Sequence, residues 1–175
     1  MSKENVYIPE DNRLNDLTKY KVVKERLRER GVELVQIAEL TCELQKQYVP
    51  DITVEICLEH VERVVMKRET QHAVLTGLEL DVLAEKKLLS EPLLSMLLGD
   101  YGLYGIDEIL ALSIVNVYGS IGFTNFGYVD KLKPGIIGDL DKQGAEPGRC
   151  NTFLDDIVGA IAAAAASSIA HKYSV

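Results

Sequence analysis

The chain has 175 residues, of which 47% are hydrophobic and 26% are charged, and this length and composition are typical of one ordinary globular domain. Its formal net charge of -8 argues against binding to nucleic acid or to an anionic membrane surface, because both need a basic footprint. The three cysteines, Cys42, Cys57 and Cys150, stand far apart without a CxxC pair, so neither a zinc site nor a disulfide framework is indicated.

The N-terminal half shows the periodicity of amphipathic helices. Residues 1–12 are polar, and we expect them to form a loose arm. Asp51 is the predicted N-cap of the third helix, and His60 and His72 are expected at the surface among charged neighbours. Apolar residues at helical spacing predict amphipathic helices over residues 17–30, 34–48, 51–65 and 70–82, and a short helix over residues 93–98; the spacing leaves open whether the third and fourth helices are continuous.

The C-terminal half is more apolar and is interrupted by glycines. Residues 106–118 predict a helix that is apolar on almost every side, and the last helix carries no charge from Ile157 to Ala170. Residues 119–127 predict a bend of small residues, and residues 138–151 predict a loop. No segment alternates with period two, so we predict an all-α, single-domain helical bundle of residues 1–175 with the apolar C-terminal helix at its centre.

Acidic residues stand at the ends of these apolar elements. Carboxylates at a helix start can be explained by the helix dipole alone, but five of them are costly there unless a divalent cation compensates their charge. Mg²⁺ prefers a few carboxylates together with waters and substrate phosphate, and basic side chains nearby suit the phosphate oxygens. The acids that we expect to converge on one pocket are Asp107, Glu108, Asp130, Asp155 and Asp156.

The order of these residues carries a resemblance. The run Phe126-x-x-x-Asp130-x-x-Lys133-Pro134, then Asp141, then Asp155-Asp156-Ile157 and small residues, resembles the C-terminal signature of the phosphatidylglycerophosphatase A family. Upstream, Gly105-Ile106-Asp107-Glu108 is similar to the central Asp-Glu motif of that family. The resemblance covers residues 105–170 and implies a Mg²⁺-dependent phosphatase that converts phosphatidylglycerophosphate to phosphatidylglycerol in phospholipid biosynthesis.

The resemblance also implies roles for individual side chains. It implies that Asp107, Glu108, Asp130 and Asp156 are catalytic and that these four together with Asp155 hold the metal ion. We expect the substrate phosphate to be bound by Lys133, Lys131 and Arg149.

The sequence also departs from the family pattern. The N-terminal Gly-Thr-x-Gly-Ser motif of the family has no counterpart, and residues 157–170 are too few and too rich in alanine to span a bilayer. We therefore expect a soluble, cytoplasmic branch of the family that at most touches the inner face of the membrane. The expected partners are a phosphorylated small molecule or phospholipid and, through the amphipathic N-terminal half, further copies of the chain, but not nucleic acid.

Two alternatives remain open from the sequence. Glu59-x-x-Glu62 invites comparison with all-α pyrophosphohydrolases, so the substrate is alternatively a soluble phosphorylated metabolite or nucleotide. The other alternative is a non-catalytic helical oligomerisation module with the same fold.

Overall fold

The computed structural model describes residues 15–99 and 104–173, and these residues form helices and turns but no strand, which confirms the predicted all-α class. The predicted arm of residues 1–12 lies outside the described residues. The helices are α1 (Asp16–Glu29), α2 (Leu34–Gln45), α3 (Val54–Val65), α4 (Arg68–Glu85), α5 (Leu93–Gly99), α6 (Ile106–Val115), the 3₁₀ helix η2 (Asn116–Tyr118), α7 (Gly119–Leu132), α8 (Ile136–Gly144) and α9 (Leu154–Tyr173).

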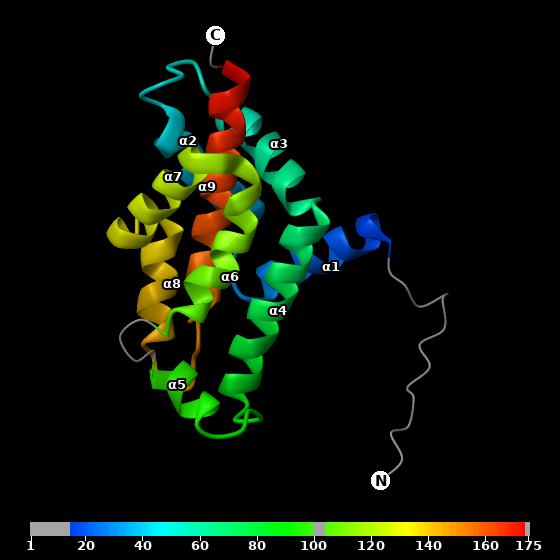
Figure 1. The fold of residues 1–175 in the computed structure, drawn as a ribbon, viewed down its shortest axis with the longest axis vertical. Coiled ribbons are helices and arrows are strands. Elements are labelled where there is room, and N and C mark those ends of the chain that lie inside the picture. Colours follow the sequence, from blue (N-terminus) through cyan, green and yellow to red (C-terminus); the bar gives the residue numbers. More distant parts are fainter. Residues whose placement is uncertain (1–14, 100–103, 174–175) are drawn as a thin grey trace.

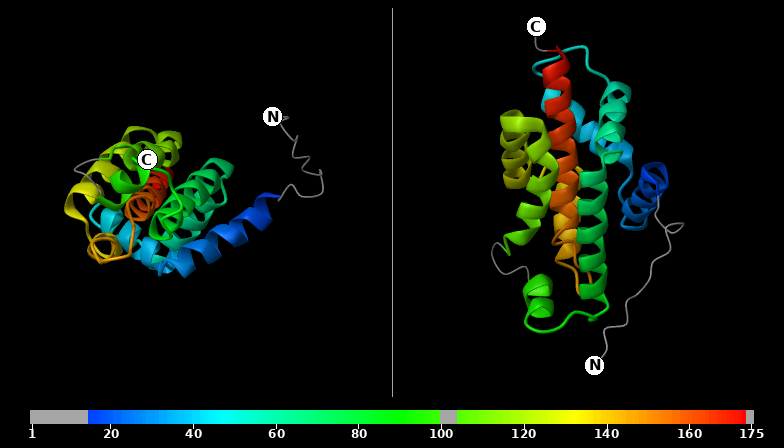
Figure 2. Two further views of the ribbon diagram at one scale, coloured as in Figure 1. Left: turned by 90° about the horizontal axis from the view of Figure 1, so that it is seen from below. Right: turned by 45° about the vertical axis from the view of Figure 1, so that its right-hand side comes forward.

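Helix α9 lies at the centre of the bundle, as the sequence predicts (Figure 1). Every residue from Leu154 to Ser167 is buried, and the helices α2, α3, α4, α6, α7 and α8 all pack directly on it. The view from below in Figure 2 shows these helices arranged around α9, whereas α1 packs on α4 at the outside. The central helix needs no polar face, because it meets protein on every side.

Small residues let the surrounding helices approach α9 closely. A Cβ atom added at Gly159 on α9 would lie 3.3 Å from Val129 Cγ2 on α7. A Cβ atom added at Gly77 on α4 would lie 2.5 Å from Ile157 Cδ1 on α9 and 3.0 Å from Cβ of Phe153, which directly precedes α9. The absence of a side chain at Gly77 therefore sets how closely α4 packs against the start of α9.

The Gly77→Ala variant tests this contact, and we expect it to lower the free energy of unfolding by about 1–3 kcal/mol, because the added methyl group overpacks the core. The matched control is Gly127→Ala on α7, where an added Cβ meets no atom within 4 Å. Relief of the helix penalty of glycine should raise the stability of that control by up to about 1 kcal/mol. Urea unfolding of both variants measures the difference, and equal stabilities would show that α4 can shift away from α9.

Two segments that the sequence analysis assigns to irregular structure are helical. Residues 119–127 are not a bend but the first part of α7, and only Gly119, with φ +70°, turns the chain there. Gly122 is buried inside the helix, where an added Cβ would lie 2.9 Å from Val115 Cγ1, so it serves close packing. The expected loop of residues 138–151 contains most of α8, which is short and buries only Ile137 and Leu140.

Two local predictions in the N-terminal half are also wrong. The N-cap of α3 is Thr53 and not Asp51, because the Thr53 hydroxyl accepts a hydrogen bond of 3.4 Å from the Ile56 backbone N–H. His60 is not at the surface but 2% exposed, and its Nδ1 lies 2.9 Å from Ser168 Oγ on α9. The charged residues next to His60 in sequence suggest an exposed position, but His60 lies on the inner face of α3 with Val61 and Val64.

Within the described part of the chain, two helical stretches are long and apolar enough to cross a membrane by length and composition, which differs from the expectation of none. Leu154–Tyr173 contains an 18-residue stretch with a mean hydropathy of 1.2, and 83% of that stretch is buried inside the protein, as expected for a core helix. Ile106–Leu132 contains an 18-residue stretch with a mean hydropathy of 1.4, of which only 28% is buried. This second stretch is not one straight rod, because the chain turns at Gly119 and α7 packs against α6.

Candidate active site

The two acid pairs and Asp130 line one cavity of about 270 Å³ beside the N-terminal end of α9. Its walls come from α6, α7, α8 and α9, so residues far apart in the sequence converge there. We call this cavity the acidic pocket, and it is lined by Asp107, Glu108, Asp130, Lys133, Asp141, Thr152, Asp155 and Asp156. Asp141, which the family signature includes but to which the sequence analysis gives no role, is thus part of the pocket.

The first turns of α6 and α9 present the acid pairs. Helix α6 begins after Gly105, whose φ of +83° lets the chain turn into the helix, and Asp107 and Glu108 stand in its first turn. The Asp107 Oδ1 atom accepts a hydrogen bond of 3.0 Å from the Glu108 backbone N–H. Asp155 and Asp156 are both buried in the first turn of α9. The positive ends of two helix dipoles therefore point at the carboxylates.

Lys133 stands between these acids at the C-terminal end of α7. Its Nζ atom lies 2.9 Å from Asp130 Oδ1, 2.9 Å from Asp155 Oδ2 and 3.9 Å from Asp156 Oδ1. The Lys133 backbone is left-handed, with φ +47° and ψ +51°, which is uncommon for a residue other than glycine. A Cβ atom at Gly138 would lie 2.5 Å from the Lys133 carbonyl oxygen, so the start of α8 packs on this strained turn only because residue 138 is glycine.

The acids of the pocket outweigh its lysine. Burial raises the pKa of Asp155 to about 6, although Lys133 acts in the opposite direction. Burial, together with the nearby Asp155, raises the pKa of Asp156 to about 9. Burial alone would lower the pKa of Lys133, but Asp155 and Asp130 hold it above its ordinary value. The pocket therefore holds a lysine that keeps its proton, but this single positive charge does not balance the negative charges of the surrounding carboxylates.

The donor set of the acidic pocket fits a hard divalent cation such as Mg²⁺, because its acids offer only carboxylate oxygens. Within residues 15–99 and 104–173, no three of the acidic, histidine or cysteine side chains already stand in the arrangement of a bound metal ion. The ammonium of Lys133 lies among the carboxylates instead. A bound cation would balance part of the negative charge that Lys133 now balances, and the ammonium could then turn toward another anion.

Two of the expected phosphate-binding residues do not line the acidic pocket. Lys131 and Arg149 are both exposed, and neither belongs to the walls of the pocket. Lys131 lies next to Asp130 in sequence, but successive residues of a helix point about 100° apart, so its side chain leaves the wall. Of the three basic residues that the sequence analysis assigns to the phosphate, only Lys133 reaches the site.

A buried polar network behind the pocket fixes the start of α9. Asp81 on α4 is fully buried, and its carboxylate accepts hydrogen bonds from the backbone N–H of Phe153 at 3.1 and 3.2 Å and of Leu154 at 3.0 Å. Asp81 thus caps α9 from a neighbouring helix, immediately before Asp155 and Asp156. The one sign of this role in the sequence is that Asp81 follows Val74 and Leu78 on the apolar face of α4, where a carboxylate needs a partner.

Arg30 holds the loop before α9 in the same network. Its guanidinium binds Glu85 at 2.8 Å, the Cys150 carbonyl at 2.7 Å and Asn151 Oδ1 at 2.8 Å. Asn151 in turn donates a hydrogen bond of 2.8 Å to the Leu140 carbonyl on α8. The network therefore ties α1, α4 and α8 to Cys150 and Asn151 in the loop before α9.

The acids that suggest a pyrophosphohydrolase have other partners. Glu62 accepts a hydrogen bond of 3.1 Å from the Tyr20 hydroxyl, and Glu59 lies 3.7 Å from Arg63. Neither glutamate lines the acidic pocket.

Comparison with known proteins agrees with the resemblance in the sequence. Residues 34–171 match the family described as Phosphatidylglycerophosphatase A. The uncharacterized protein YutG of Bacillus subtilis is 62% identical over 147 residues, which cover 84% of this chain and 87% of that protein. A protein of unknown function from Bacillus stearothermophilus has a solved structure that is 60% identical, with a TM-score of 0.84 over 88% of this chain and 94% of that one.

The low temperature requirement C protein of Listeria monocytogenes has a crystal structure that is 55% identical, with a TM-score of 0.87 over 92% of this chain and 100% of that one. These relatives share the fold along nearly their whole length. The family match includes α2 to α8, most of α9 and all the residues that line the acidic pocket. The chain therefore belongs to the phosphatidylglycerophosphatase A family.

Proposed function

We propose that this protein is a Mg²⁺-dependent phosphatase that removes the terminal phosphate of phosphatidylglycerophosphate. The observation that carries the proposal is the convergence of six acids and Lys133 on one pocket, in a chain that belongs to this family. Carboxylates that raise one another's pKa and surround a single lysine need more positive charge than the protein supplies. A bound cation would balance the charge of the carboxylates, and a phosphate group would pair with the ammonium of Lys133.

The side chains of the pocket would divide the work as follows. Asp107, Glu108, Asp130, Asp155 and Asp156 would hold the metal ion, which when bound supplies Lewis-acid activation of the phosphoryl group and of water. Lys133 would donate hydrogen bonds to a phosphate oxygen, because its ammonium keeps its proton and already lies at the pocket. Asp130 and Asp155 orient that ammonium through their contacts of 2.9 Å. The left-handed turn at the end of α7 places Lys133 at the pocket.

Exposed apolar side chains near the pocket favour a lipid over a soluble substrate. Ile106 is 50% exposed and Ile109 is 62% exposed, and both neighbour the acid pair of α6 in sequence. On α7, Leu132 is 56% exposed and directly precedes Lys133. Exposed apolar side chains on the two helices that carry pocket acids are suited to contact the acyl chains of a lipid phosphate. The same side chains would support contact with a membrane surface without a spanning helix.

Release of inorganic phosphate tests the proposal. We expect the full chain to hydrolyse phosphatidylglycerophosphate in mixed detergent micelles when Mg²⁺ is present and to lose that activity when EDTA is added. Glycerol 3-phosphate serves as the soluble comparison, and we expect its kcat/KM to be lower by ~100-fold or more, because it makes no apolar contact. Asp139→Asn, at an exposed acid of α8 that does not line the pocket, is the control and should retain full activity.

Each other outcome of this assay points to a named alternative. Preferential turnover of glycerol 3-phosphate or of a nucleotide would show that the substrate is a soluble metabolite. Activity that persists in EDTA would exclude the proposed cofactor. Absence of phosphate release from every substrate, with the fold intact, would support the non-catalytic oligomerisation module.

A further inference from the structure

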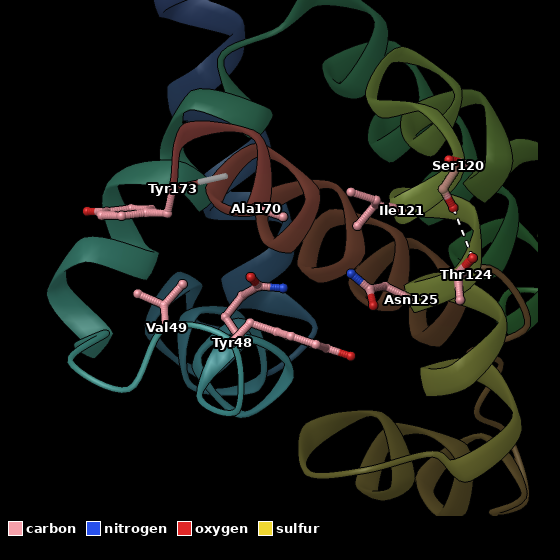
Figure 3. A pocket seen from close by; sticks show the side chains of 9 residues that line it. Tyr48, Val49, Ser120, Ile121, Thr124, Asn125, Ala170 and Tyr173 are labelled. Carbon is pink, nitrogen blue, oxygen red and sulfur yellow. Dashed lines mark hydrogen bonds between the residues drawn. The ribbon is translucent and has the colours of Figure 1, made fainter. Parts of the chain in front are cut away.

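A second cavity, of about 430 Å³, lies between α2 and α7 on the other side of α7 from the acidic pocket. Ile121 lines this cavity and Asp130 lines the acidic pocket, and the two residues stand nine positions apart on α7. Nine residues are about two and a half helical turns, so the two side chains leave α7 on opposite flanks. We call this second cavity the α2–α7 cleft, and Ala170 of α9 forms part of its floor (Figure 3).

Two amide side chains of the cleft have a buried polar atom without a hydrogen-bond partner. Gln45, the last residue of α2, is 1% exposed, and its Oε1 atom has no hydrogen-bond partner. Across the cleft, Asn125 on α7 has a buried Nδ2 atom without a partner. Burying an amide with unsatisfied atoms costs free energy, and Leu at either position would avoid that cost. A ligand that satisfies both amides explains why the chain carries them there.

The lining of the cleft limits the chemistry of such a ligand. Among the described residues, no charged side chain lines the cleft, so a phosphate or carboxylate would lose its hydration there without a compensating charge. Each side-chain amide offers one acceptor oxygen and one donor NH₂ group, and a 180° rotation of the amide exchanges their positions. Such a pair of amides matches a ligand edge that carries both a carbonyl and an N–H group. Tyr48 is 70% exposed and Tyr173 is 40% exposed, and both rings stand at the cleft (Figure 3). Exposed aromatic rings beside a polar slot suit a planar, ring-shaped molecule.

The cleft continues past Asn125 into an adjoining cavity of about 440 Å³. The two cavities share Tyr48, Thr124 and Asn125, and the second also reaches Glu43 and Pro134. Glu43 is the charged side chain among the residues of the adjoining cavity, and it would repel an anion. The cleft therefore has room for a ring with an uncharged substituent, and it disfavours a ring that carries a phosphate.

We propose that the α2–α7 cleft is a binding site for a neutral, planar heterocyclic amide, the chemical class of the nucleobases and nucleosides. Gln45 and Asn125 bind its amide edge, and Tyr48 and Tyr173 cover its ring. The site is separate from the acidic pocket, and it holds its ligand whether or not the acidic pocket performs the proposed reaction.

Binding measurements with defined probes test this site. Saturation-transfer NMR and calorimetry on the full chain use nicotinamide, uridine, adenosine and adenosine 5′-monophosphate as the probes. We expect at least one of the three neutral probes to bind and the monophosphate to bind ~10-fold more weakly than adenosine or not at all. Absence of binding by all the neutral probes, or equal binding of the monophosphate, would overturn the proposal.

Two variants separate ligand recognition from a structural role of the amides. Gln45→Leu and Asn125→Leu should each weaken binding by ~10-fold or more and leave the ligand-free melting temperature unchanged or higher, because each removes unsatisfied polar atoms. Gln143→Leu on α8, outside the cleft, is the matched control and should bind as the wild type does. Asp156→Asn should also bind normally, so a failure of the phosphatase assay and a failure of this site remain distinguishable.

The remaining outcomes would overturn the proposal. If both leucine variants melt at clearly lower temperature, the amides hold a structural water and not a ligand. If sedimentation shows a dimer whose formation Tyr48→Ala abolishes, the cleft is an interface between copies of the chain.

Discussion

The Asp156→Asn variant is expected to lose phosphatase activity and, at the same time, to be more stable than the wild type. Asp156 is 5% exposed in the first turn of α9, and it lines the acidic pocket with Asp155 and Lys133. We expect kcat/KM for phosphatidylglycerophosphate to fall by ~1,000-fold or more, because an amide neither compensates the charge of the cation nor coordinates it as strongly as a carboxylate. Isothermal titration should show a parallel loss of Mg²⁺ affinity.

The gain in stability follows from the same burial. Burial and the neighbouring Asp155 raise the pKa of Asp156 from its ordinary value of 3.8 to about 9. The folded state thus holds this proton more tightly than the unfolded chain does, so the contribution of Asp156 to stability falls as the pH rises from about 4 to 9. Asparagine does not titrate, and we expect it to raise the free energy of unfolding by about 1–2 kcal/mol at pH 8 in EDTA.

Urea unfolding in EDTA at several pH values measures this gain, which should be largest at high pH and vanish near pH 4. Asp139→Asn, an exposed acid of α8, is the control and should follow the wild type at every pH. A less stable Asp156→Asn protein at pH 8 would mean that the carboxylate is a structural group. Wild-type activity in this variant would remove Asp156 from the metal site.

The parts of the fold that the sequence predicts well are those where burial follows from composition alone. Helix α9 is predictable because residues 157–170 carry no charge, so the helix has no side that favours water. Helix α8 is not predictable in this way, since it buries only two side chains among glycines and charges. The helical structure around Gly122 is not predictable either, because in sequence a glycine that permits close packing cannot be told from a glycine that breaks a helix.

The acids of the candidate site are predictable, but their surroundings are not. Their order along the chain carries the family resemblance, and the packing of α6, α7 and α8 on α9 brings them together. Lys131 and Arg149 do not line the acidic pocket, because the direction of a side chain is not determined by how close the residue lies to the acids in sequence. The capping role of Asp81 depends on a contact between residues 72 positions apart, and only the packed bundle reveals such a contact.

Substitution of Asp81 is expected to lower both stability and activity, because Asp81 holds the start of α9, which carries the proposed metal ligands. The Asp81→Ala variant leaves the buried N–H groups of Phe153 and Leu154 without an acceptor. We expect a loss of about 2–4 kcal/mol in the free energy of unfolding at pH 5, since each unsatisfied buried donor costs about 1–3 kcal/mol. We also expect kcat to fall by ~10-fold, because the first turn of α9 then frays where it carries Asp155 and Asp156.

The pH dependence of Asp81→Asn distinguishes capping from charge. Burial raises the pKa of Asp81 from its ordinary value of 3.8 to about 7, although the N–H of Phe153 and the charge of Arg30 oppose this rise. The carboxyl of the wild type therefore contributes less and less to stability as the pH rises from about 4 to 7, and the loss levels off above pH 7. Asparagine keeps an acceptor but never ionises, so Asp81→Asn should lack this pH-dependent loss.

Urea unfolding of the wild type and the two variants between pH 4 and 8 measures these effects, with phosphate release as the second readout. Glu79→Ala, an exposed position on the same helix, is the control and should change neither property by a measurable amount. Asp81→Asn should retain most of the activity that Asp81→Ala loses, because the asparagine oxygen still holds part of the first turn of α9. Equal pH profiles for wild type and Asp81→Asn would show that the carboxyl does not titrate in this range, and equal activity of Asp81→Ala would show that the metal ligands keep their positions without the cap.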